Sequence, residues 1–361
     1  DGVGLLLGPQ YLLLRHEFRG FQIRHSSETT PSKTRQIIVT FGGCDGANWT
    51  ARAIAACSLI TNFKLEIVAV IGAGNRHQEA IKSAIDNSSY QVETYYDVKN
   101  ISALMNKADL AITASGTTVW ELAALGVPAL VIPVADNQRQ IAETLDMLGV
   151  AQNLGWHEFM TEDKMATALQ ALLADPARQA AMATAGHSLV DGDGEARVIR
   201  ELRGNPGEIE LRSASLADVT AMWNLANRPE VRNNSFSPEL IPFSSHVRWF
   251  VAKLANPNCR ITVAVRNGQL LGQIRYDRLA NGFAAEIDIA VAPTGRGQGL
   301  AARLLNETAA QACRALKVPG LLATVFADNQ ASLQLFRRAG FAETGRSNRA
   351  GHEVVTMTWQ P

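Results

Sequence analysis

Two carboxylates and a glycine-rich turn follow one another closely near residue 290 of this chain. Glu286 and Asp288 alternate with apolar residues in a pattern typical of a half-buried strand, so they share one face of it. The turn Thr294–Gly299 comes next, and we expect a helix to begin near Leu300. Glycines in such a turn let backbone N–H groups approach a phosphate, and a helix N-terminus favours negative charge. The residues therefore predict a diphosphate held by the backbone beside two carboxylates.

The order of Arg296, Gly299 and Ala301 within this stretch is more specific than a glycine turn alone. It resembles the acetyl-CoA signature of the GNAT N-acetyltransferases, Gln/Arg-x-x-Gly-x-Gly/Ala, in its expected place after a strand. The segment Asn329–Phe341 strengthens the resemblance, which extends over residues 208–361. It implies an acyltransferase domain that uses acetyl-CoA as cosubstrate.

The resemblance assigns roles to residues around the turn. Main-chain N–H groups bind the acetyl-CoA pyrophosphate, here those of Arg296, Gly297, Gln298, Gly299, Leu300 and Ala301. Val291 supplies an N–H that polarises the thioester carbonyl, and Asn329 contacts the cofactor arm. The family often has a tyrosine seven residues after this asparagine, which protonates the CoA thiolate. Phe336 stands at that position and has no proton to donate, so the role is open to Ser332 or to water.

Amine acetylation also needs a group that removes a proton from the amine. A positioned carboxylate can contribute roughly 10²–10⁴-fold to such a step. Glu286 and Asp288 are the candidates, acting directly or through water, and Glu286 is favoured. The alternative is that both lie on a solvated strand face. His246 and Trp249 share an expected helix on the acceptor side, and we expect both to be structural.

Apolar strands alternate with helices through the first half of the chain. Expected strands cover residues 36–41, 65–71, 92–95, 109–113 and 129–133. This alternation predicts an α/β domain with a parallel, doubly wound sheet. In such sheets ligands bind beyond the C-terminal ends of the strands. Three polar or glycine-rich turns lie at those ends: Gly42-Gly43, Ser115-Gly116-Thr117 and Asp136-Asn137-Gln138.

The segments Phe41–Asp45 and Ser115–Pro128, with the turn at Asp136, resemble the C-terminal half of the PseG-type UDP-sugar hydrolases. These are relatives of the MurG-like GT-B glycosyltransferases. The resemblance covers residues 1–200 and implies a Rossmann-like half that binds UDP. The diphosphate would meet Gly42, Gly43, Ser115, Gly116 and Thr117, the ribose Glu121, and the sugar side Asn137 and Gln138. Asn137 is also a candidate for the hydrolytic chemistry, whereas Glu121 could instead be a helix-surface carboxylate.

Three parts of the chain follow from these resemblances. Residues 1–35 form the interdomain segment of a truncated GT-B hydrolase, residues 36–204 the UDP-sugar-binding domain, and residues 208–361 the α+β GNAT domain. The chain begins with Asp1, and we expect the other hydrolase half, with its glycine-rich loop and catalytic histidine, to be missing from it. Without that half we expect no efficient hydrolysis.

Local signals in the second half add detail to the expected α+β order. Ser215 with Asp218 three residues later approximates a helix capping box. Asn267-Gly268 between two apolar runs predicts a tight hairpin. Val354–Trp359 is expected to be the last strand.

Composition narrows the classes of partner. Lys+Arg 34 and Asp+Glu 34 give zero net charge, so nothing indicates a nucleic-acid partner. Cys44, Cys57, Cys259 and Cys313 form no C-x-x-C pair and are expected as reduced thiols of a cytoplasmic protein. The histidines show no metal-binding spacing, and no apolar run reaches membrane-spanning length. We therefore expect no metal and no membrane partner; a homodimer is left open.

The two resemblances meet in one pathway. PseG-type enzymes hydrolyse UDP-2,4-diacetamido-2,4,6-trideoxy-β-L-altropyranose on the way to pseudaminic acid, and a GNAT enzyme of PseH type acetylates the 4-amine of the same UDP-sugar. The leading hypothesis is an acetyl-CoA-dependent N-acetyltransferase acting on a UDP-4-amino-sugar, fused to an incomplete UDP-sugar hydrolase. One rival is a GNAT enzyme that acetylates a protein or peptide amine. Another is a nucleotide-sugar-binding module with weak or no acetyltransferase activity.

Overall fold

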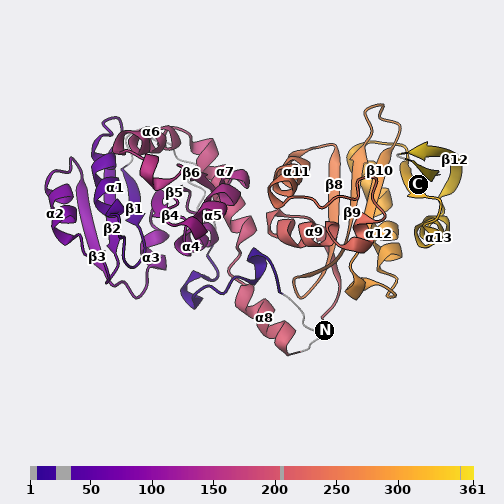
Figure 1. Ribbon diagram of the computed structural model, residues 1–361, viewed down its shortest axis with the longest axis horizontal. Coiled ribbons are helices and arrows are strands. Elements are labelled where there is room, and N and C mark those ends of the chain that lie inside the picture. The colour runs from indigo at the N-terminus through magenta and orange to yellow at the C-terminus, as the bar shows by residue number, and fades with distance from the viewer. Residues whose placement is uncertain (1–5, 22–33, 204–206, 350) are drawn as a thin grey trace. The chain divides into compact units, whose positions relative to one another are not determined.

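The computed structural model describes residues 6–21, 34–203, 207–349 and 351–361 (Figure 1). The chain divides into two compact units. The N-terminal unit runs from Leu12 to Glu195, and the C-terminal unit comprises Ala196–Pro361 together with the described residues up to Tyr11. Each unit has its own sheet.

The N-terminal unit is built on a six-stranded sheet in the order β3-β2-β1-β4-β5-β6, and every pairing in it is parallel. The strands are β1 (Arg35–Thr40), β2 (Leu65–Ile71), β3 (Gln91–Tyr96), β4 (Leu110–Ala114), β5 (Ala129–Ile132) and β6 (Ala151–Asn153). The helices are α1 (Trp49–Ser58), α2 (Gln78–Asp86), α3 (Ser102–Met105), α4 (Thr118–Leu125), α5 (Asp136–Met147), α6 (Glu162–Leu173) and α7 (Pro176–Leu189), and α8 (Gly194–Leu202) follows. The expected doubly wound, Rossmann-like architecture is confirmed.

Burial on both faces explains why these strands are apolar throughout. Ile37 and Val39 of β1 pack into a core with Trp49 and Ile54 of α1, whereas Ile38 between them is fully buried on the other side of the strand. Parallel strands with helices on both sides have no solvent face, so they lack the alternation of a half-buried strand. Helices cover both faces of this sheet in Figure 1.

The C-terminal unit has a mixed seven-stranded sheet in the order β12-β13-β11-β10-β9-β8-β7. Its strands are β7 (Glu210–Ser213), β8 (Cys259–Arg266), β9 (Gln269–Arg278), β10 (Ala285–Val291), β11 (Leu321–Phe326), β12 (Ala342–Arg349) and β13 (His352–Trp359). The helices are α9 (Val219–Ala226), α10 (Pro229–Arg232), α11 (Phe243–Ala255), α12 (Leu300–Leu316) and α13 (Gln330–Arg338). Only β10 and β11 pair in parallel; the other pairings are antiparallel.

The local signals of this unit are confirmed. The Ser215–Asp218 capping box is present in full. Asn267 and Gly268 have φ angles of 53° and 86°, the positive values that the tight turn between β8 and β9 requires. The apolar face of β10, with Ile287, packs with Leu304 of α12 in one core. Glu286 and Asp288 consequently point to the opposite face.

Two strands, β6 and β12, were not predicted. β6 has only three residues, too few to show an apolar period. Every residue of β12 is exposed, and its sequence, Ala-Glu-Thr-Gly-Arg-Ser-Asn-Arg, has no apolar alternation. Its place is set by pairing with β13, whose Val354 and Val355 are buried. A solvated edge strand is held by backbone pairing and needs no alternation of apolar side chains. Hydrophobic periodicity therefore does not detect such a strand.

Candidate functional site

The turn after β10 has the conformation that its glycines allow. Gly297 and Gly299 have φ angles of 73° and 70°, and a Cβ built on either would meet nothing within 4 Å. Gly299 is the N-cap of α12, and no side chain caps this helix end. Backbone N–H groups at an uncapped helix N-terminus attract anions. The turn therefore offers the open, positively polarised end that a diphosphate needs.

Hydrogen bonds hold the turn against the sheet. Nε of Arg296 donates to the carbonyl oxygen of Val291 at 3.3 Å, which brings two predicted site residues together. The side chain of Gln298 donates to the Thr294 carbonyl at 2.8 Å and accepts from Arg266 at 2.9 Å. Leu300 is buried and anchors the first turn of α12, where Ala301 follows. The six predicted residues thus run consecutively from the open turn into the first turn of α12.

The two central strands separate beside this turn. β10 pairs with β9 along its whole length, from Ala285 to Val291, but with β11 only at Ala285 and Glu286. Ala285 donates its N–H toward β11, to Gly320, at 3.1 Å. Because strand amides alternate in direction, the N–H groups of Ile289 and Val291 also point toward the β11 side, where the neighbouring strand has diverged. An extended molecule could pair with this edge.

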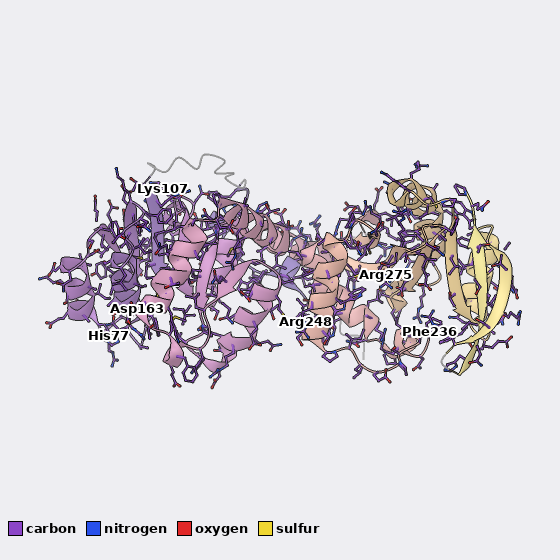
Figure 2. The ribbon with its side chains drawn as sticks, turned by 90° about the horizontal axis from the view of Figure 1, so that it is seen from above. His77, Lys107, Asp163, Phe236, Arg248 and Arg275 are labelled. Atoms are coloured by element: carbon purple, nitrogen blue, oxygen red, sulfur yellow. The ribbon has the colours of Figure 1, made fainter. Side chains whose placement is uncertain are left out.

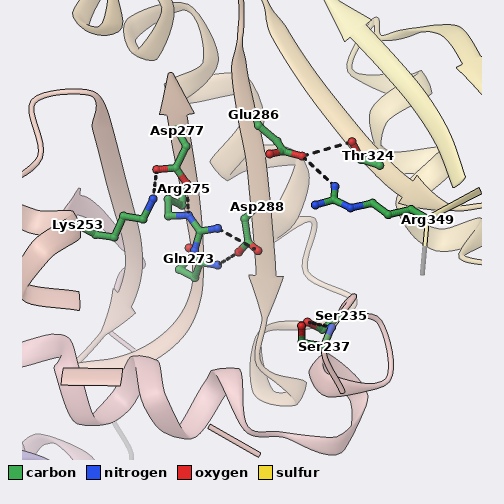
Figure 3. A network of polar contacts seen from close by, with 10 residues as sticks. All are labelled: Ser235, Ser237, Lys253, Gln273, Arg275, Asp277, Glu286, Asp288, Thr324 and Arg349. Carbon is green, nitrogen blue, oxygen red and sulfur yellow. Dashed lines mark hydrogen bonds and ion pairs between the residues drawn. The ribbon is translucent and has the colours of Figure 1, made fainter. Parts of the chain in front are cut away.

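The two carboxylates on β10 face different partners (Figure 3). One oxygen of Glu286 lies 3.4 Å from the Thr324 hydroxyl of β11 and 3.8 Å from a guanidinium nitrogen of Arg349. Asp288 accepts a 2.6 Å hydrogen bond from the side chain of Gln273 and lies 3.7 Å from Arg275. Asp288 is therefore held by one short hydrogen bond from β9, whereas among the described residues the polar contacts of Glu286 are longer, at 3.4 and 3.8 Å.

A chain of charges supports Asp288 from β9 and α11. Arg275 donates to Asp277 at 2.7 Å, and Lys253 donates to the other oxygen of Asp277 at 2.6 Å. Burial raises the pKa of Asp277, but the hydrogen bond from Lys253 and the charge of Arg275 outweigh it and lower that pKa overall. Trp249, whose ring lies 5.1 Å from the guanidinium carbon of Arg275, covers the network. The alternation of Gln273, Arg275 and Asp277 along β9 is the sequence signal that could have revealed this network, but no prediction was based on it.

Two other residues of the acetyltransferase motif serve the structure of α13. The side-chain oxygen of Asn329 accepts the Ser332 N–H at 3.1 Å and so caps the helix, while its amide donates to Asn234 at 2.9 Å. Among the described residues, no hydrogen bond joins Asn329 to the turn. Phe336 is buried, with its ring centroid 5.0 Å from that of Phe341. His246 is also buried, stacked on Phe250 of the same helix, α11.

In the N-terminal unit, the predicted loops meet where the strand order reverses. The connections run from β1 outward through β2 and β3, then return to β4 on the other side of β1. Gly42-Gly43 follows β1 and Ser115-Gly116-Thr117 follows β4, and these two strands are paired neighbours. Doubly wound sheets bind ligands at such a reversal.

The loops after β4 and β5 are joined directly. Ser115 is fully buried and donates to the carbonyl oxygen of Gln138 at 3.2 Å. The side-chain oxygen of Gln138 accepts the Val134 N–H at 3.1 Å, and its nitrogen lies 3.7 Å from the position of a Cβ on Gly116. Asn137 beside it is exposed. The structure thus places Ser115, Gly116 and Gln138 in one cluster with Asn137 at its rim.

The two helix N-termini at this reversal differ in a way that the sequence did not suggest. Asp45, which is buried, accepts the N–H groups of Trp49 and Thr50 at 2.7 and 2.8 Å, so a carboxylate of the chain already occupies the start of α1. No side chain caps α4, whose N-cap is Thr117. The start of α4 is consequently the end that remains open to an anion.

Glu121 lies in the first turn of α4 and is paired with Arg15. One of its oxygens accepts a 3.0 Å hydrogen bond from the Arg15 guanidinium, and the Glu121 side chain is 16% exposed. Burial raises the pKa of Glu121, and the hydrogen bond from Arg15 partly offsets it. Among the described residues, no hydrogen bond to the second oxygen of this carboxylate is found.

Close backbone packing fixes the Gly42-Gly43 loop, which leads to a test. A Cβ on Gly72, after β2, would lie 2.4 Å from the Cα of Gly43 and 2.5 Å from the carbonyl oxygen of Gly42. We expect Gly72→Ala to destabilise the N-terminal unit by about 1–3 kcal/mol, because backbone atoms have to move. Gly46→Ala is the control, since its Cβ would meet nothing within 4 Å. Equal urea midpoints for the two variants would contradict the expectation.

Comparisons with known proteins agree with the two architectures. Residues 37–195 match the glycosyltransferase family 28 C-terminal domain, and residues 219–341 match the acetyltransferase (GNAT) family. Over 192 residues the chain is 29% identical to the spore coat polysaccharide biosynthesis protein SpsG of Bacillus subtilis (strain 168), covering 53% of this chain and 56% of that protein. Over 145 residues it is 26% identical to the L-amino acid N-acetyltransferase AaaT of Escherichia coli (strain K12), covering 39% of this chain and 88% of that protein.

A third relative is the UDP-N-acetylglucosamine–N-acetylmuramyl-(pentapeptide) pyrophosphoryl-undecaprenol N-acetylglucosamine transferase of Sulfurimonas denitrificans. It is 33% identical over 145 residues, 38% of this chain and 40% of that protein. The chain therefore spans about half of SpsG and less than half of this transferase. A solved structure of the acetyltransferase yncA from Salmonella typhimurium, described as putative, with its cofactor acetyl-CoA, is 20% identical, with TM-score 0.39 over 42% of this chain and 93% of that one.

Metal sites and membrane spans can be considered for residues 6–21, 34–203, 207–349 and 351–361. In that part of the chain, no three His, Cys, Asp or Glu side chains are grouped to hold a metal ion. None of its helices combines the length and apolar character needed to cross a bilayer. The matched residues and the two sheets together identify a glycosyltransferase family 28 C-terminal domain at residues 37–195 and a GNAT acetyltransferase domain at residues 219–341.

Proposed function

We propose that the C-terminal unit is an acetyl-CoA-dependent N-acetyltransferase that acts on a UDP-4-amino-sugar in nonulosonate biosynthesis of the pseudaminic acid type. The observation that carries the transferase activity is the separation of β11 from β10 beside the open turn 296–301. This arrangement supports an extended cosubstrate that pairs with a strand edge and ends in a diphosphate.

Acetyl-CoA would be held by the backbone. Its pyrophosphate would meet the N–H groups from Arg296 to Ala301, and its pantetheine arm would lie along the free edge of β10. The Val291 N–H, directed toward that edge, would donate to the thioester carbonyl oxygen and stabilise the charge that develops there. Asn329, which caps α13, would border the cofactor arm.

The transfer itself needs one proton acceptor and one proton donor. The amine nitrogen attacks the thioester carbonyl carbon, a C–N bond forms and the C–S bond breaks. One proton passes from the amine to Glu286, and one proton joins the departing thiolate. Phe336 is buried and carries no proton for the thiolate, so we assign that proton to water or to Ser332 at the start of α13.

The N-terminal unit would hold the nucleotide part of a UDP-sugar molecule that is bound separately from the acetyl acceptor. The uncapped start of α4, with Ser115, Gly116 and Thr117, suits the diphosphate, and Gly42-Gly43 borders the same strand reversal. The free oxygen of Glu121 suits a ribose hydroxyl. Asn137 and Gln138 lie beside Gly116 on the side assigned to the sugar. Family membership and the names of SpsG and the Sulfurimonas transferase support a carbohydrate substrate.

A second candidate is acetylation of an amino-acid or peptide amine. It is favoured by the likeness to AaaT, which is named for L-amino acids and is covered over 88% of its length. A third candidate, a nucleotide-sugar-binding module with weak or no acetyltransferase activity, is favoured by the buried Phe336.

The test is acetyl-CoA turnover by the full chain with a UDP-4-amino-sugar, L-amino acids and peptides as acceptors. We expect the highest kcat/KM with the UDP-4-amino-sugar. Preference for amino acids or peptide N-termini would replace the proposed acceptor and keep the reaction. Tight CoA binding without turnover of any acceptor would support the binding module instead.

A further inference from the structure

An arginine lies beside Glu286, and a phenylalanine stacks on that arginine. Arg349, the last residue of β12, reaches Glu286 from the hairpin of β12 and β13 (Figure 3). Its guanidinium carbon lies 4.2 Å from the ring centroid of Phe236. Phe236 belongs to the loop between α10 and α11 and is labelled with Arg275 in Figure 2. Three separate segments are thus linked through Glu286, Arg349 and Phe236.

Contacts on both sides of Phe236 fix its position. Its ring packs edge-on against Phe326 of β11, with centroids 4.9 Å apart. Two residues earlier, Asn234 accepts the hydrogen bond from Asn329. At the far end of the loop, the Ile241 N–H donates to Asn227 at 2.7 Å. A guanidinium stacked on a fixed ring keeps its plane and exposes the donors on its edge.

The contact between Arg349 and Glu286 leaves both groups incompletely satisfied. At 3.8 Å it is an ion pair and not a hydrogen bond, and the Arg349 side chain is 54% exposed. Among the described residues no hydrogen bond from Arg349 is found, whereas Arg346 on the same strand donates to Glu343 and Glu353 at 2.7 and 3.2 Å. The site therefore presents one available anion and one available cation side by side.

We propose that Arg349, stacked on Phe236, recognises an anionic group of the acceptor while Glu286 takes the amine. This rests on the proposed acetyltransferase activity and names its substrate class: a small amine that carries a phosphate or carboxylate. The diphosphate of a nucleotide sugar and the α-carboxylate of an amino acid both have this chemistry. Arginine binds either through paired hydrogen bonds to two oxygens.

The test compares each charged acceptor with a partner that lacks its anion. The pairs are a UDP-4-amino-sugar with the methyl glycoside of the same amino-sugar, and L-leucine with L-leucinamide. In the full chain, Arg349→Met should raise the KM of the charged acceptor that the enzyme uses at least about 10-fold. The KM of its neutral partner should stay unchanged. Arg346→Met should change neither, and Arg349→Lys should fall between because lysine keeps the charge but loses the fork. Which charged member responds identifies the source of the anion.

Three outcomes would overturn this inference. If the wild-type protein uses neutral and charged partners equally, no anion is recognised, although the acetyltransferase proposal stands. If Arg349→Met impairs both members of a pair alike, the residue is structural. If no amine is acetylated by the wild-type protein, the proposed activity itself fails, and the inference fails with it.

Discussion

Glu286→Gln is expected to lower kcat/KM for acetyl transfer by about 10²–10⁴-fold, the usual contribution of a general base. Glutamine keeps the shape of the side chain and an oxygen that can accept from Thr324, but it cannot take the proton of the amine. Glu286 has only long contacts, at 3.4 and 3.8 Å, so its carboxylate is available for proton transfer. The measurement is the pH–rate profile of the variant beside that of the wild-type protein.

Asp288→Asn is the matched control on the same strand face. Asp288 is held by Gln273 and Arg275, so it is expected to organise the site without accepting the proton. Its replacement should lower kcat/KM less than the replacement of Glu286 does, and it should leave the shape of the pH–rate profile unchanged. CoA affinity should be retained in both variants, because neither side chain belongs to the turn 296–301. A larger loss in Asp288→Asn, with an altered profile, would transfer the role of base to Asp288.

The second large effect concerns acid stability and His246. Burial lowers the pKa of His246 from its ordinary value of 6.5 to about 4, partly offset by a hydrogen bond to the backbone of Val219. Between these two pH values the unfolded chain binds a proton that the folded protein does not. Stability from this group is therefore complete above pH 6.5 and is lost as the pH falls toward 4, by roughly 3 kcal/mol.

His246→Phe tests this expectation because it keeps an aromatic ring stacked on Phe250 and cannot be protonated. The urea midpoint of the wild-type protein should fall between pH 6.5 and pH 4 by more than that of the variant. At each pH, the difference between the two urea midpoints removes the contribution of the titratable groups that both proteins have in common. Parallel midpoints over this range would show that His246 does not govern the acid response.

Much of the fold was predictable from local patterns. The parallel sheet follows from buried apolar strands alternating with helices, and the hairpin at Asn267-Gly268 from residues that tolerate positive φ. Two strands were missed: β6, which has only three residues, and β12, whose eight residues are all exposed. A strand that pairs at a solvated edge shows no apolar period, so only its partner β13 reveals it.

The candidate site was predictable in part, for a related reason. The turn 296–301 was visible because glycine conformation and helix starts are encoded over a few residues. Three contacts were not visible in the sequence: Asp45 at the start of α1, Arg15 with Glu121, and Arg349 with Glu286. The two arginines reach carboxylates more than sixty residues away in the chain, and sequence spacing alone carries no signal for such pairs.

The sequence by itself determined which chemistry the chain can support: a backbone turn for a diphosphate, a strand with two carboxylates, and a second sheet with small polar loops at its strand ends. These features depend on φ angles, side-chain alternation and helix starts, which neighbouring residues control. The sequence favoured Glu286 over Asp288 as the base, but only the tertiary structure gave the two carboxylates different surroundings, because both lie on the same face of β10 and differ in what β9, β11 and β12 place beside them. The divergence of β11 from β10, which opens the strand edge, is likewise a property of the sheet and not of either strand.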